Sequence, residues 1–164
     1  MKPFTFERTQ TLPITLEAAW KFFSNPANLV KITPPGMDFR ITSPPQIGVY
    51  AGQIITYTVR PLLRVAVDWT TEITHVDRPN FFVDEQRFGP YRFWHHQHRF
   101  CEVEGGVDVH DLVHYLLPHD QLAGLINRLF VAPRLRVIFD FRRMTLAKLF
   151  PDRERNLNNV EVSP

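Results

Sequence analysis

The sequence contains a single cysteine, Cys101, among its 164 residues. One cysteine excludes an internal disulfide framework and suits the reducing conditions of the cytosol. Residues 1–10 carry an acidic side chain and lack the apolar core of a signal peptide. No apolar run approaches the roughly 18 residues that a membrane span requires. These absences predict a cytoplasmic protein without stable membrane insertion.

A strong charge of one sign and glycine-rich loops are also missing. The chain has 19 Lys and Arg residues against 17 Asp and Glu, a formal net charge of +2, which offers no support for a nucleic-acid partner. None of the seven glycines belongs to a phosphate-binding loop, and the Gly-x-Ser-x-Gly motif of serine nucleophiles is absent. We therefore expect no nucleotide and no other cofactor.

Apolar residues are plentiful instead, at 44% of the chain, and they include 14 phenylalanines. The length fits one domain with one core, which we place at residues 1–150. Phenylalanine rings can line a pocket, although core packing is their commoner use. Residues 151–164 are polar and aperiodic, which predicts a disordered tail.

Hydrophobic periodicity predicts strands and short helices over most of the chain. Alternation at Phe4–Arg8 indicates a strand, and Thr15–Phe23 indicates a helix with Thr15 as its N-cap. A second helical turn carries Leu29 and Ile32 between two proline signals. Six more strands follow, separated by turn residues: Phe39–Thr42, Gln53–Val59, Val65–Ile73, Phe81–Phe88, Tyr91–Glu102 and Val107–Leu117.

After Pro118 the periodicity becomes helical and stays so to Phe150. The apolar stripe of Gln121–Phe130 points in a different direction from the stripe that follows it. Pro133 lies between the two stripes, and a proline inside a helix kinks or ends it. We therefore predict a short helix, a break near Ala132-Pro133, and a longer helix to about Phe150.

This order of elements predicts an α+β fold, in which a curved antiparallel sheet of about six to seven strands wraps around the long C-terminal helix. Two short helices follow the first strand. A sheet that wraps around a helix often leaves a gap between the two, and such gaps hold ligands.

Five segments carry a family resemblance: Phe82-Val83-Asp84-Glu85-Gln86, Gly89-Pro90-Tyr91, Trp94-x-His96-x-His98-x-Phe100, Asp111-x-Val113-x-Tyr115-x-x-Pro118 and Ile138-Phe139-x-Phe141-Arg142. They resemble the START-like superfamily, also called SRPBCC, which includes the birch-pollen allergen and lipid-transfer domains. Within it, the series is similar to a bacterial ligand-binding subfamily that is sometimes joined to a sugar-epimerase-like domain described as a cell-division inhibitor. The resemblance covers roughly residues 2–150. It implies a helix-grip fold and a hydrophobic cavity, and it implies no reaction. It also offers an epimerase-like protein as one candidate partner.

The hairpin between the last two strands allows side chains to be assigned to faces. A two-residue turn at Gly105-Gly106 pairs Glu104 with Val107 and places Asp111 diagonal to His98. The more apolar face, which we assign to the concave side of the sheet, carries Trp94, His96, His98, Phe100, Asp111, Val113 and Tyr115.

The polar residues of this face allow three interpretations. His96, His98 and Asp111 could form a satisfied buried network. His96, His98 or Tyr115 could instead orient the polar head of a ligand. The third interpretation is general acid–base chemistry by His98 and Asp111, which no nucleophile motif supports. A zinc site needs three or four converging ligands, and two histidines with Asp111 fall short, so we expect no metal.

Arg142 lies in the middle of the apolar stripe of the last helix, where an inward arginine needs a partner. It could anchor a carboxylate or phosphate of a ligand. It could also form a salt bridge to Asp111 or Glu85, or extend to the helix edge. The helix is otherwise basic, which suits a solvated face or an anionic partner surface.

Together these features favour a non-enzymatic module that binds or carries a small hydrophobic or amphipathic molecule between the sheet and the last helix. One alternative is an enzyme of the cyclase or hydrolase type that uses His98 and Asp111. Another is a protein that serves an epimerase-like or cell-division-inhibitor partner. The expected ligand contacts are Trp69, Trp94, His96, His98, Tyr115, Ile138, Phe139 and Arg142.

Overall fold

The computed structural model describes residues 2–60, 65–118 and 121–152. Within these residues, seven strands form one antiparallel sheet in the order β1-β7-β6-β5-β4-β3-β2. Residues 153–164, most of the predicted tail, lie outside the described residues. The strands are β1 (Phe4–Leu12), β2 (Arg40–Ile41), β3 (Gln53–Val59), β4 (Val67–Asp77), β5 (Phe81–Phe88), β6 (Phe93–Val103) and β7 (Gly106–Leu116).

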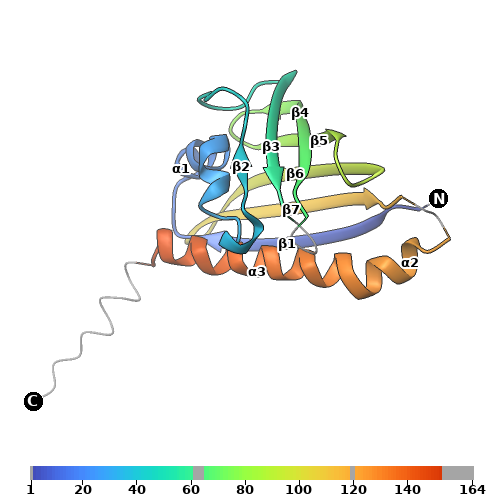
Figure 1. Ribbon diagram of the computed structural model, residues 1–164. Helices are drawn as coiled ribbons and strands as arrows, with labels where there is room; N and C mark the ends of the chain where they lie inside the picture. The colour runs from blue at the N-terminus through green and yellow to red at the C-terminus, as the bar shows by residue number, and fades with distance from the viewer. Residues whose placement is uncertain (1, 61–64, 119–120, 153–164) are drawn as a thin grey trace, which may run out of the picture.

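The sheet curves around the C-terminal helix, which confirms the predicted α+β helix-grip fold. In Figure 1, α3 (Ala132–Leu149) runs alongside β1, while β3 and β4 rise steeply away from it. The helix α1 (Leu16–Phe23) lies at one end of the sheet. Two short 3-10 turns, η1 (Pro26–Val30) and η2 (Pro35–Met37), connect α1 to β2.

The curvature of the sheet has a local cause in β4. The pairing of β4 with β5 shifts in register between Thr70 and Thr71, and again between Ile73 and His75. Irregularities of this kind bend a strand and increase its twist. The bends help the sheet to curl around α3 instead of lying flat against it.

Thr15 caps α1 as predicted. Its side-chain oxygen accepts a hydrogen bond from the backbone N–H of Ala18 at 3.2 Å. Glu17 in the first turn and Lys21 in the last turn both suit the helix dipole. Ala19 and Trp20 are buried in the core, whereas Ala18 is exposed.

The C-terminal helix is continuous, so the predicted break at Ala132-Pro133 is wrong. α2 (Ala123–Ile126) passes through a π-helical turn, η3 (Asn127–Val131), into α3. The N–H of Ala132 donates to a carbonyl five residues earlier. A π turn rotates the apolar stripe without ending the helix, and Pro133 follows directly after it as the second residue of α3. No helix among the described residues is long and apolar enough to cross a membrane.

The register of β6 against β7 differs from the predicted one by two residues. The turn is centred on Glu104-Gly105, where Gly105 has a φ of 85°, so His98 pairs directly with Asp111 instead of lying diagonal to it. Gly106 is already part of β7. It lies so close to the backbone of Leu12 that a side chain there would collide with it.

The assignment of residues to the concave face is nevertheless confirmed. Side chains alternate with a period of two along a strand, so a shift by two residues leaves each side chain on its own face. The buried positions of β6 and β7 that the sequence assigned to this face are Trp94, His96, His98, Phe100, Asp111, Val113 and Tyr115.

Candidate functional site

A cavity of about 190 Å³ lies between the concave face of the sheet, the η1–η2 segment and α3. Tyr115 is not among its lining residues, and its hydroxyl donates to Asn127 Oδ1 at 2.7 Å. The other expected contacts do lie on the cavity wall: Trp69, Trp94, His96, His98, Ile138, Phe139 and Arg142.

Polar side chains interrupt the core at the middle of the molecule. The buried apolar residues form two clusters, one around Trp20 and Phe100 and the other around Trp94 and Phe139. On β7, Asp111 lies between Val109 of the first cluster and a valine of the second. We call the polar residues that lie between the two clusters the polar belt: Asp84, His96, His98, Asp111 and Arg142.

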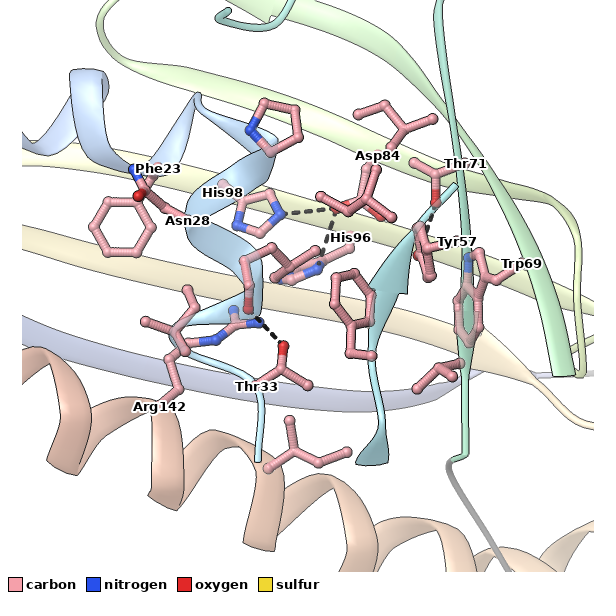
Figure 2. Close-up of a pocket in the computed structure, with 18 of the residues that line it drawn as sticks. Phe23, Asn28, Thr33, Tyr57, Trp69, Thr71, Asp84, His96, His98 and Arg142 are labelled. Carbon is pink, nitrogen blue, oxygen red and sulfur yellow. Dashed lines mark hydrogen bonds and ion pairs between the residues drawn. The ribbon is translucent and has the colours of Figure 1, made fainter. Parts of the chain in front are cut away.

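The two histidines of the polar belt lie between two carboxylates. His98 Nε2 is 2.8 Å from Asp84 Oδ2, and His96 Nδ1 is 3.3 Å from the same oxygen. Figure 2 shows both imidazoles directed at Asp84. On the other side, His96 Nε2 and His98 Nδ1 each lie 2.9 Å from Asp111 Oδ1. The first contact is a hydrogen bond, whereas His98 Nδ1 is at ion-pair distance without hydrogen-bond alignment.

These contacts change the acidity of the groups. Burial opposes a charge on His96, but Asp84 and Asp111 outweigh burial and raise the pKa of His96 to about 9. Burial favours a neutral Asp84, yet the two histidines hold its pKa well below the ordinary value. For Asp111, burial is outweighed by Arg142 and then by the histidines, which lower its pKa strongly. The polar belt therefore holds both aspartates as anions.

Arg142 reaches the polar belt from α3. Its side chain is 9% exposed, its Nη1 is 3.5 Å from Asp111 Oδ1, and its guanidinium lies 4.6 Å from the centre of the Phe139 ring. Its buried Nε has no hydrogen-bond partner among the described residues. Glu85, the other partner considered from the sequence, contacts His95 instead. Arg142 is thus a buried cation whose ion-pair partner, Asp111 Oδ1, is 3.5 Å away and also contacts His96 and His98.

Asp84 is the functional candidate that the sequence reasoning did not single out. It comes from β5, where it follows the buried Phe82 by two residues and therefore shares its face. The signal in the sequence was a charged residue, Asp84, at a position of the strand that faces inward. With Asp84 included, three ligand atoms from Asp84, His96 and His98 lie within 4.8 Å of one another, a grouping that could hold a metal ion.

Solved structures share this fold at low sequence identity. The NMR structure of KanY protein covers 93% of this chain and 100% of its own, with 14% identity and a TM-score of 0.70. The crystal structure of TTHA0849 from Thermus thermophilus covers 96% and 100%, with 15% identity and a TM-score of 0.65. Ara h 8.0201 covers 89% and 99%, with 12% identity and a TM-score of 0.58.

No protein-family model matches the sequence, and the search of curated proteins finds no match. Identities of this size establish a common architecture and carry no information about ligand or reaction. The chain is thus similar to these proteins in its fold, a curved antiparallel sheet closed over a long C-terminal helix.

Proposed function

We propose that the protein binds one small amphipathic molecule, whose apolar body occupies the cavity and whose acidic head contacts Arg142. The observation that carries the proposal is the position of Arg142: it is buried, it lies on the cavity wall, and its Nε has no hydrogen-bond partner among the described residues.

The size of the cavity limits the ligand. An apolar cavity of about 150 Å³ is large enough to bind benzene. A cavity of about 190 Å³ therefore suits one ring or a short alkyl chain with one small polar group. It lies below the range of about 300–1,000 Å³ that is typical of pockets for larger ligands. A lipid with two acyl chains does not fit this volume.

The walls favour an apolar body. Trp69, Trp94 and Phe139 line the cavity with aromatic side chains, and Ile138 adds an aliphatic side chain from α3. Aromatic rings contribute large contact areas and prefer tilted or edge-on partners. Burying such a body removes apolar surface from water, at about 25 cal/mol per Å².

The charges favour an acidic head. Asp84 and Asp111 are both balanced by imidazole contacts, whereas Arg142 shares one distant oxygen of Asp111. A buried donor without an acceptor is costly. A ligand carboxylate in the cavity can accept from the guanidinium of Arg142, which lies on its wall, in a charge-assisted pair. The positive charge of a basic ligand would instead be repelled by the positive charge of Arg142.

Binding is better supported than catalysis by His98 and Asp111. A general base needs a nitrogen that can reach a proton of the substrate. Both nitrogens of His96 and of His98 lie within 3.3 Å of a carboxylate oxygen. His96 also has its pKa raised to about 9, so it is protonated near neutral pH and holds no free lone pair.

The direct test is mass spectrometry of the protein after gentle isolation from its own host, first native and then denatured. The expected result is one small acid released per chain. Isothermal titration of ligand-free, chelator-treated protein with benzoate, and with benzyl alcohol as its uncharged counterpart, then measures the part played by the acidic head. Benzoate should bind more tightly than benzyl alcohol.

Arg142→Gln should reduce benzoate affinity by more than tenfold and leave the binding of benzyl alcohol nearly unchanged. Arg143→Gln is the matched control, because Arg143 is the next residue of α3, carries the same charge and is exposed. Equal losses of benzoate affinity in the two variants would mean that the net charge of the protein, and not a contact with Arg142, causes the effect. No released acid and no benzoate binding would contradict the proposal.

A further inference from the structure

We propose that Asp84, His96 and His98 form a binding site for one divalent transition-metal ion, with an open coordination position that faces the cavity. The proposal rests on the arrangement of the polar belt and does not depend on the proposed amphipathic ligand. The donor atoms are Asp84 Oδ2, His96 Nδ1 and His98 Nε2.

The three donor atoms already converge. His98 Nε2 lies 2.8 Å and His96 Nδ1 lies 3.3 Å from Asp84 Oδ2, and all three ligand atoms lie within 4.8 Å of one another. Metal bonds of about 2.0–2.2 Å in a tetrahedral site require donor atoms separated by roughly 3.4 Å. The two separations from Asp84 Oδ2 lie within about 0.6 Å of that value.

Rigid elements hold these donors. His96 and His98 are two residues apart on β6 and therefore share a face, and β5 pairs Asp84 with His96 in the next strand. His98 stacks on Phe82 at a centroid distance of 4.3 Å, and the rings of His96 and His98 lie 3.8 Å apart. Sites built on strands with packed side chains are more precise than sites on loops.

A second carboxylate stands behind the histidines. Asp111 Oδ1 is 2.9 Å from His96 Nε2 and 2.9 Å from His98 Nδ1, the two nitrogens that the metal would not use. Metal-binding histidines almost always direct their other nitrogen to a carboxylate, a carbonyl or water, which fixes the orientation of the ring. Arg142 in turn contacts Asp111 at 3.5 Å. The arrangement thus supplies ligands and their support together.

The proposed coordination sphere is open on one side. Asp84, His96 and His98 line the cavity, whereas Asp111 does not. Three protein ligands with a free position are typical of reactive zinc sites and of two-histidine, one-carboxylate iron(II) sites. The nitrogen donors favour zinc, iron(II) and their neighbours over calcium or magnesium, which prefer oxygen.

Charge balance suits a dication. A metal ion must displace the proton that His96 carries in the metal-free protein, because a ligating imidazole is neutral. With both imidazoles neutral, the two aspartates and Arg142 give the polar belt one net negative charge. A divalent ion changes this to one net positive charge. The fourth position would then favour water, hydroxide or an anionic group over a cation.

The experiment is equilibrium dialysis of the full, chelator-treated chain against Zn²⁺ alone, followed by elemental analysis. We expect one ion per chain in the wild-type protein. Asp84→Asn and His98→Gln should abolish this binding, and Asp111→Asn should weaken it about 10–100-fold. His95→Gln is the control, because His95 lies on the other face of β6 and contacts Glu85; it should bind as the wild type does.

A measurement on the wild-type chain covers the case in which these variants do not fold. Stoichiometric Zn²⁺, which is diamagnetic and acts only locally, should shift the histidine ring NMR signals of His96 and His98 and leave those of His110 and His114 unchanged. Less than one Zn²⁺ per chain would overturn the metal site, as would Asp84→Asn binding like the wild type or Zn²⁺ shifting the ring signals of the outer histidines instead. Because Zn²⁺ is tested without an organic ligand and benzoate without a metal, either proposal can fail alone.

Discussion

His98 and Asp111 face each other across β6 and β7, with His98 Nδ1 2.9 Å from Asp111 Oδ1. The same oxygen contacts His96 Nε2 at 2.9 Å and Arg142 Nη1 at 3.5 Å. One carboxylate oxygen is therefore the common partner of three groups that come from β6 and α3. Through these contacts Asp111 connects the concave face of the sheet with Arg142 of α3, the helix that covers it.

Asp111→Asn should lower the free energy of unfolding by about 3–5 kcal/mol, because it leaves a buried cation without its counter-charge. Urea denaturation followed by circular dichroism measures this. Asp108→Asn on the same strand is the control. Asp108 accepts an exposed hydrogen bond from Thr11 at 2.6 Å, and asparagine keeps the acceptor oxygen, so this exposed substitution should change stability by less than about 0.5 kcal/mol. Equal losses would show that the polar belt contributes no special stability.

Metal-free protein should lose stability as the pH rises above neutrality. The pKa of His96 is raised from its ordinary 6.5 to about 9, because Asp84 and Asp111 outweigh its burial. The raised value means that the folded state binds the proton more tightly than the unfolded state. This stabilisation is complete below pH 6.5 and disappears as the pH passes through about 9.

At acid pH the two aspartates make stability change in the opposite direction: it falls as the pH falls. The pKa values of Asp84 and Asp111 lie below their ordinary value of 3.8, so their contribution is present above that pH and is lost below it. Melting temperatures measured across this range should be highest between about pH 4 and 6.5. In His96→Gln the alkaline decline should flatten. An unchanged alkaline decline in that variant would contradict the assignment to His96.

Gly106→Ala should destabilise the fold by at least about 1 kcal/mol. Gly106 has a φ of 151°, and an added Cβ would collide with the backbone of Leu12 in the neighbouring β1. Gly124→Ala is the matched control, since Gly124 is helical and has open space around its Cβ position. It should stabilise by about 0.5–1 kcal/mol through helix propensity. Thermal unfolding of the two variants distinguishes the effects.

The fold was predictable because strand and helix periods extend over many residues. Alternation along β6 and β7 placed His96, His98 and Asp111 on the concave face, and this held although the predicted pairing was off by two residues. The face on which a side chain lies follows from alternation along one strand alone. The residue it pairs with on the next strand depends on which residues form the turn. The turn forms at Glu104-Gly105, with Gly105 at a φ of 85°, and Gly106 lies in β7 close to the backbone of Leu12.

Two other features depended on contacts that periodicity does not encode. The π turn at Asn127–Val131 lets two differently directed apolar stripes belong to one continuous helix. From the sequence alone, Pro133 explains the change of direction equally well as the end of that helix. The position of Asp84 beside His98 depends on how β5 pairs with β6, and no tight turn joins these strands to set the register. Local patterns therefore identified the face but not the full set of residues that meet on it.

Ile138→Phe should reduce benzoate affinity at least about tenfold, because the larger side chain enters the cavity wall opposite the aromatic face of the sheet. The loss of stability should stay within about 1–3 kcal/mol, the usual cost of overpacking. Val137→Phe is the control: Val137 is the preceding residue of α3 and is 54% exposed, so it should leave both quantities nearly unchanged. Titration calorimetry gives the affinity, and urea denaturation gives the stability. Equal benzoate binding by Ile138→Phe and the wild type would mean that the ligand does not occupy the space between α3 and the sheet. Arg142 would then have to be explained as a purely structural partner of Asp111.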